Sequence, residues 1–81
     1  MTVVDHEAPE PLYQQVAAVL RGQIKDGTLT GRVPSASTIA QRYEVAKGTA
    51  ERALAILREE GLIRSVMGRG HFVVPPGDRP S

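Results

Sequence analysis

Residues 65–74, SVMGRGHFVV, decide the fold that this sequence predicts. Gly68 and Gly70 flank Arg69, a pattern that fits either a loop that binds phosphate or the turn of a β-hairpin. A phosphate-binding glycine loop follows a strand and leads into a helix, whose N-terminus holds the phosphate. Here a second apolar run and then prolines follow the glycines, so the sequence favours a hairpin with one arginine at its tip.

Three helical patterns precede this hairpin. The first helix covers residues 11–26, with Pro11 at its first position and an apolar residue at every fourth place. Ser35 is a candidate N-cap for a short second helix, and a third helix begins near Lys47 and ends before Gly61. The predicted inward-facing residues are Leu12, Val16, Leu20, Ile24, Ile39, Ala40, Tyr43, Ala50, Ala53, Leu54 and Leu57.

The order of these elements predicts a mainly α fold with a small β-hairpin, a winged helix-turn-helix of three helices plus a wing. The domain covers residues 11–75, with the helix-turn-helix at about 35–60 and the wing at about 62–74. Residues 1–10 and 76–81 have no apolar periodicity, and we expect a flexible arm and a flexible tail or linker.

Composition excludes several classes of function. A chain of 81 residues without cysteine forms one domain and has neither a disulfide nor a thiolate metal site. No apolar run approaches the roughly 20 residues that span a bilayer, and the acidic residues 1–10 do not have the charged and apolar regions of a signal peptide, so we expect a cytoplasmic, nucleoid-associated protein. His6 and His71 lie in no metal-binding or catalytic spacing. We therefore expect no enzyme activity, no metal ion and no cofactor.

The distribution of charge is more informative than the net charge of +1. Residues 1–10 contain acids and no Lys or Arg, whereas bases outnumber acids over residues 32–75. A major groove accepts one α-helix, whose first residues contact base edges while the preceding helix crosses the phosphates. This pattern predicts double-stranded DNA as the partner of the chain.

Candidate contacts follow from that docking geometry. At the start of the third helix the candidates for base contact are Lys47, Gly48, Thr49 and Arg52. On the preceding loop and helix the candidates for phosphate contact are Arg32, Ser35, Ser37, Thr38 and Arg42. At the hairpin, Arg69, Gly70 and His71 are candidates for the minor groove, whose negative potential attracts arginine.

Each candidate also has an ordinary structural interpretation. The polar residues of the third helix fit a solvated face, Ser35 fits a helix cap, and Arg69 fits a solvated charge on a plain turn. Glu51 counts against DNA contact because phosphate repels a carboxylate, although a carboxylate accepts a hydrogen bond from cytosine. Glu51 is therefore either a specific contact or is turned away from DNA.

The chain resembles the N-terminal DNA-binding domain of the GntR family of bacterial transcription regulators. The resemblance rests on PLYQQVAAVLRGQIKDGTL for the first helix, VPSASTIAQRYEVAKGTAERAL for the helix-turn-helix and EEGLIRSVMGRGHFVV for the wing. It covers about residues 11–74, and the wing sequence GRG followed by FV is its most specific part.

The sequence departs from the family at positions that face DNA. After Pro-Ser the family usually has Glu and Arg, where this chain has Ala36 and Ser37. Where the family commonly has Ser-Arg-Thr-Thr-Val-Arg, residues 46–51 are AKGTAE. Lys47 lacks the forked guanidinium that binds guanine with two bonds, and Glu51 replaces an arginine, for which Arg52 is a candidate substitute.

Two functions follow from these observations. The first is a sequence-specific regulator of transcription that binds a palindromic operator as a homodimer, because one small module contacts few base pairs. The alternative is a winged-helix module that binds another protein and has weak or lost DNA binding. The resemblance implies a C-terminal ligand-binding and dimerising domain, so the sequence is either a piece that stops before it or a small regulator without it.

Overall fold

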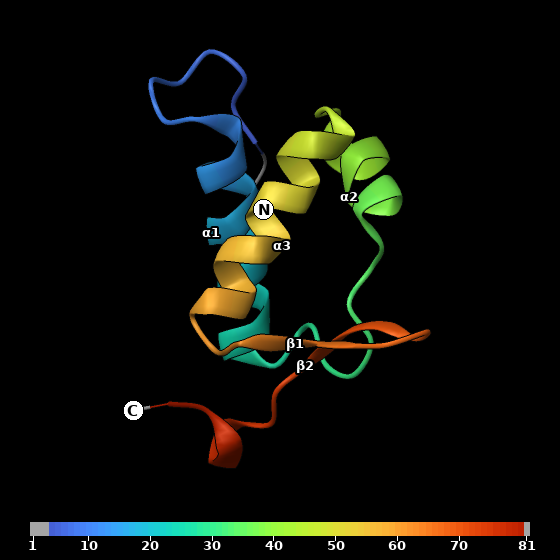
Figure 1. The fold of residues 1–81 in the computed structure, drawn as a ribbon. Helices are drawn as coiled ribbons and strands as arrows, with labels where there is room; N and C mark the ends of the chain where they lie inside the picture. Colours follow the sequence, from blue (N-terminus) through green and yellow to red (C-terminus); the bar gives the residue numbers. More distant parts are fainter. Residues whose placement is uncertain (1–3, 81) are drawn as a thin grey trace.

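The computed structural model describes residues 4–80 of the chain. Its elements are α1 (Leu12–Asp26), α2 (Ala36–Tyr43), α3 (Lys47–Glu59), β1 (Ile63–Val66), β2 (Gly70–Val73) and a 3-10 helix (Pro76–Asp78). α1 and α3 lie side by side, α2 packs beside the start of α3, and the hairpin lies at the other end of α3 (Figure 1). We call β1, β2 and the turn between them the wing. The predicted winged helix-turn-helix is confirmed.

A single apolar core joins the three helices to the wing. Its fully buried members come from α1, α2, α3 and β1, and the largest are Val16, Leu20, Ile39, Leu57 and Ile63. Burying one such side chain contributes about 1.5–3 kcal/mol. Because α1, α2, α3 and β1 each supply at least one of them, the core fixes the wing relative to α3.

Local signals set the ends of the helices. Pro11 was predicted as the first residue of α1, and this was wrong by one residue, because its ψ of 143° is extended and its carbonyl accepts the first helical bonds. The Ser35 hydroxyl accepts from the Thr38 amide, as predicted for an N-cap. At the end of α3, Gly61 has a φ of +77°, and the amide of Leu62 donates to the Leu57 carbonyl. This arrangement is a Schellman motif.

The wing is an antiparallel pair with an additional short segment at its edge. The sequence favours a hairpin loop of four residues, MGRG at 67–70, but Val66 pairs with Gly70, so the connection is residues 67–69 and that loop is too long by one residue. Gly70 joins the strand at a φ of +99°, which glycine adopts without strain. Arg32 forms an isolated bridge with Phe72, and the amide of Val33 donates to the His71 carbonyl. Residues 32–33 precede Pro34, a position that favours extended backbone, and these contacts confirm that the segment is extended.

An ion pair links α1 to the end of α3. The Arg21 guanidinium donates two hydrogen bonds to the Glu60 carboxylate, at 2.8 and 2.7 Å. These bonds hold the pKa of Glu60 below its ordinary value and raise the pKa of Arg21. Both side chains are about one third exposed, so this pair adds little stability.

The two end segments lie against the domain where they are described. Gln15 donates to the carbonyls of Asp5 and Glu10, and Nε2 of His6 lies 2.8 Å from the Glu44 carbonyl oxygen, at the turn before α3. After the wing, Arg79 donates to the carbonyl of Val74. Residues 1–3 and 81 of the predicted arm and tail lie outside the described residues. The flexibility of both segments stays a prediction.

Candidate nucleic-acid interface

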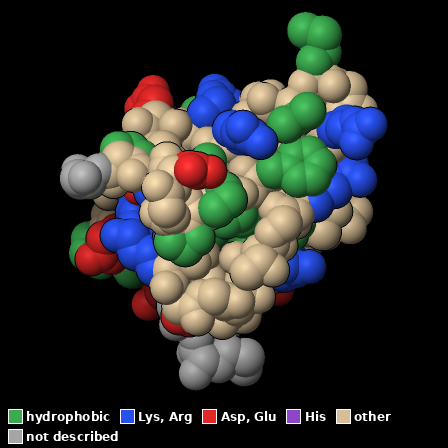
Figure 2. Space-filling model, turned by 90° about the horizontal axis from the view of Figure 1, so that it is seen from below, with side chains coloured by type: hydrophobic (Ala, Val, Ile, Leu, Met, Phe, Trp, Pro, Cys, Tyr) green, Lys and Arg blue, Asp and Glu red, His purple; other side chains and the backbone are tan. Residues whose placement is uncertain are grey.

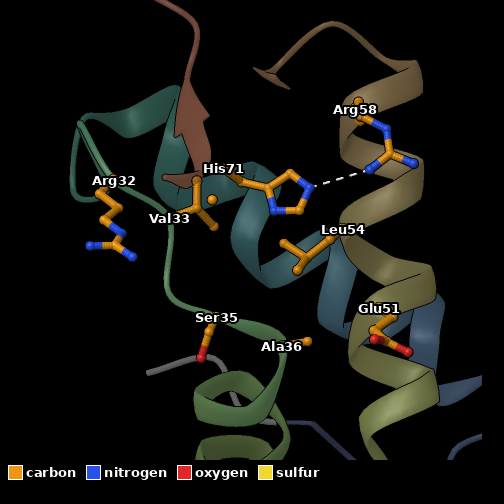
Figure 3. A pocket seen from close by; sticks show the side chains of 9 residues that line it. Arg32, Val33, Ser35, Ala36, Glu51, Leu54, Arg58 and His71 are labelled. Carbon is orange, nitrogen blue, oxygen red and sulfur yellow. Dashed lines mark hydrogen bonds between the residues drawn. The ribbon is translucent and has the colours of Figure 1, made fainter. Parts of the chain in front are cut away.

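The start of α2, one side of α3 and the wing surround a groove of about 380 Å³, which we call the wing groove. Figure 3 shows these side chains from the three elements around the opening. Its lining is Arg32, Val33, Ser35, Ala36, Glu51, Leu54, Arg58, Gly70 and His71. Four of the twelve predicted site residues, namely Arg32, Ser35, Gly70 and His71, therefore lie around one opening.

Arg58 connects α3 to the wing across this groove. Its Nη1 lies 3.2 Å from Nε2 of His71 on β2, so the guanidinium donates to the imidazole (Figure 3). Arg58 is not among the site residues predicted from the sequence, because those on α3 lie only at its start. The helical repeat was the available signal, since residues 47, 51 and 58 fall within about 40° of one another on an α-helix.

The first turn of α3 presents the predicted base-contacting residues to solvent. Lys47 and Gly48 are exposed, and Thr49 is half-buried. The buried side of the same helix begins at Ala50 and holds Leu54 against the core. The start of α3 is therefore fixed by packing on one side and open on the other.

Arg52 lies on a different side of α3 from the wing groove. Its guanidinium carbon is 4.0 Å from the ring centroid of Tyr13 on α1, which is a cation–π contact. Arg52 is exposed, and Tyr13 is half-buried. This contact fixes Arg52 at the α1 side of α3, whereas Glu51 lines the wing groove between α2 and the wing.

α2 presents its polar residues at both ends. Ser35, Ser37, Thr38 and Arg42 are all exposed. The hydroxyls of Ser35 and Thr38 are 3.0 Å apart, so the threonine joins the cap, although its position is one where a capping box has Glu or Gln. Ser35 caps the start of α2 and also lines the wing groove. Arg42 lies in the last turn of α2, at the opposite end of the helix.

The wing turn projects three residues into solvent. Met67 is 98% exposed, and Gly68 and Arg69 beside it are exposed. A Cβ at Gly70 would lie 3.8 Å from the guanidinium of Arg32, which is ordinary contact. The positive φ of Gly70 explains its glycine without any ligand, so a side chain at this position would strain the turn whether or not DNA is bound.

Charge is unevenly distributed over the surface. Figure 2 views the molecule from below Figure 1, and Lys and Arg side chains gather mostly on the right, the side of the hairpin tip, while most acidic side chains lie on the left. Within residues 4–80, no helix is long and apolar enough to span a membrane. The same residues contain no group of three His, Cys, Asp or Glu side chains placed to hold a metal ion.

A helix-turn-helix followed by a wing defines the class of winged helix-turn-helix domains. In this class the second helix of the motif, here α3, is called the recognition helix. The model of a family described as bacterial regulatory proteins, gntR family, matches residues 12–73. The chain belongs to this family. The resemblance noted from the sequence is thereby confirmed, and so is the prediction that the chain is not an enzyme, because the family consists of regulatory proteins.

Individual relatives agree with this assignment. The chain is 38% identical to the uncharacterised HTH-type transcriptional regulator RB1450 of Rhizobium meliloti, over 88% of this chain and 30% of that protein. It is 35% identical to the HTH-type transcriptional repressor NagR of Bacillus subtilis, over 90% of this chain and 31% of the repressor. The chain thus spans less than a third of these curated relatives.

A solved structure with DNA is also similar. The AraR(DBD), crystallised in complex with operator ORX1, superposes with a TM-score of 0.77 at 28% identity, over 86% of this chain and 93% of that chain. The similarity therefore extends over nearly the whole of both chains.

Proposed function

We propose that this chain is the DNA-binding part of a bacterial transcription regulator, with α3 in the major groove of double-stranded DNA and the wing at the adjacent minor groove. One observation carries the proposal: α3, the start of α2 and the wing border one opening, and the basic side chains that line it are Arg58 from α3 and Arg32 from the segment paired with β2. The operator complex of the similar AraR(DBD) supports it. No observation favours the alternative of a module that binds only protein.

The proposed contacts divide by element. Lys47, Gly48 and Thr49 face base edges, where the absence of a side chain at Gly48 permits close approach. The phosphate contacts come from Arg32, Ser35, Ser37, Thr38 and Arg42. Arg69, Gly70 and His71 contact the minor groove and its sugar edges.

Arg52 has a different proposed role from the base contact that its sequence position suggested. Its guanidinium stacks on Tyr13 at the α1 side of α3, outside the wing groove. There it donates to a phosphate, and the aromatic ring reduces the side-chain entropy lost on binding.

The proposed assembly is a homodimer on a palindromic operator in the bacterial cytoplasm. One module of this size contacts few base pairs, and a two-fold pair of modules doubles the contacted sequence. Membership of a family whose named relatives include a transcriptional repressor supports a regulatory role.

The test is a titration of the protein with DNA at several salt concentrations, in which fluorescence anisotropy measures binding. About five Lys or Arg side chains that neutralise phosphates give a slope near −4.5 in a plot of log K against log salt, because each neutralised phosphate releases about 0.9 counterion. A slope near zero, or no binding at low salt, would contradict the proposal.

A further inference from the structure

Glu51 lies in the middle of the face that α3 presents to the wing groove. It follows Lys47 by one helical turn and precedes Arg58 by two, and its side chain lines the groove opposite Ser35 and Ala36. In Figure 3 Glu51 and Arg58 project from the same side of α3. The position of Glu51, between α2 and the wing, is one that meets base edges when α3 occupies a major groove.

The carboxylate of Glu51 has no structural role in the fold that the structure describes. Over residues 4–80 it forms neither an ion pair nor a hydrogen bond, and the side chain is exposed. Glu60, by contrast, is held by Arg21, and Arg58 is directed to His71. An exposed carboxylate at this place weakens attraction to phosphate, and a hydrogen bond donated by a base would offset that repulsion.

The base edges of the major groove offer few such interactions. Guanine and the O4 of thymine present acceptors, which repel a carboxylate, whereas cytosine presents the N4 amino donor. Adenine has a donor at N6, but the N7 acceptor beside it repels the second carboxylate oxygen. We propose that Glu51 is a specificity-determining residue that accepts a hydrogen bond from the N4 amino group of a cytosine. The inference rests on the proposed DNA-binding function.

The test is selection of binding sites from a randomised duplex library with three proteins: the parent chain, Glu51→Gln and Glu59→Gln. Glu59 is the matched control, because it is exposed on the same helix but does not line the wing groove. We expect the parent to select cytosine at one base position and Glu51→Gln to select adenine there, because an amide pairs with N6 and N7 of adenine. On the selected duplexes each protein should prefer its own base about tenfold, and Glu59→Gln should match the parent.

The outcomes distinguish a failure of this inference from a failure of the proposed DNA-binding function. If Glu51→Gln selects the same sequences as the parent, or binds every sequence more tightly without a change of base preference, Glu51 is a repulsive charge and the inference is wrong. If the parent enriches no sequence at all, the proposed function fails and the inference fails with it. Far-UV circular dichroism of both variants should match the parent, since over residues 4–80 neither carboxylate forms an ion pair or hydrogen bond that the substitution removes.

Discussion

Replacing Gly61 with alanine tests the joint between α3 and the wing. Gly61 lies between α3 and β1 and has a φ of +77°. Just after it, the amide of Leu62 donates a hydrogen bond to the carbonyl of Leu57 in α3. A left-handed conformation costs a residue with a Cβ about 1–2 kcal/mol. The new Cβ would also lie 2.5 Å from Cγ and 2.6 Å from Cδ of Pro80, so that proline must move.

Gly27 supplies a matched control for the backbone cost. Its φ is +85° at the end of α1, and a Cβ there would meet nothing within 4 Å. We expect Gly27→Ala to lose about 1–2 kcal/mol of unfolding free energy and Gly61→Ala to lose more. Each kcal/mol corresponds to a fall in Tm of about 4–8 °C in a domain of this size.

The assay is urea unfolding followed by circular dichroism, with each glycine variant measured alone and with Pro80→Gly. We expect Pro80→Gly to bring the cost of Gly61→Ala down to that of Gly27→Ala, because the contact with the ring is then absent. Equal costs for the two glycine variants without that change would refute the contact with Pro80. A Gly61→Ala variant as stable as the parent would refute the left-handed backbone conformation of residue 61.

Three further outcomes follow from the same structure. Lys47→Ala should weaken binding to a selected operator by about 1–3 kcal/mol with unchanged melting, whereas Leu54→Ala should lose about 2–5 kcal/mol of stability, and gel shifts beside thermal melts distinguish the two. Arg69→Ala should reduce the salt slope by about 0.9, and Lys25→Ala, on the far end of α1, should leave the slope unchanged. Glu60→Gln should cost about 0.2–1 kcal/mol at neutral pH. Because the pKa of folded Glu60 lies below its ordinary value, urea unfolding should show this difference vanish as the pH falls through that pKa.

The elements and the core could be predicted from the sequence because they follow from local periodicity. The spacing of Ala50, Leu54 and Leu57 defines the buried side of α3, and the Ser35 cap is a contact within one helical turn. The glycines of the wing identify a turn for the same reason. Each of these features depends on residues close together in the sequence.

The parts that the sequence did not predict depend on contacts between distant residues. Periodicity places Arg52 opposite the buried stripe, but only the packing of α1 on α3 brings Tyr13 beneath it. In the same way, Arg58 acquires its place at the wing groove through His71 on β2. The orientation of a long polar side chain is set by its neighbours in space, so the face of a recognition helix is defined less sharply by sequence than its buried side.

The most direct test of DNA binding through α3 and the wing is an amide chemical-shift titration of the 15N-labelled chain with a duplex obtained by selection. The largest changes should fall in the first turns of α2 and α3 and in residues 67–70 of the wing. The outer face of α1 around Gln14, Ala18 and Arg21 should change least. Changes concentrated on that face of α1, or a spectrum unaffected by the duplex, would contradict the claim that this winged helix binds DNA through α3 and its wing.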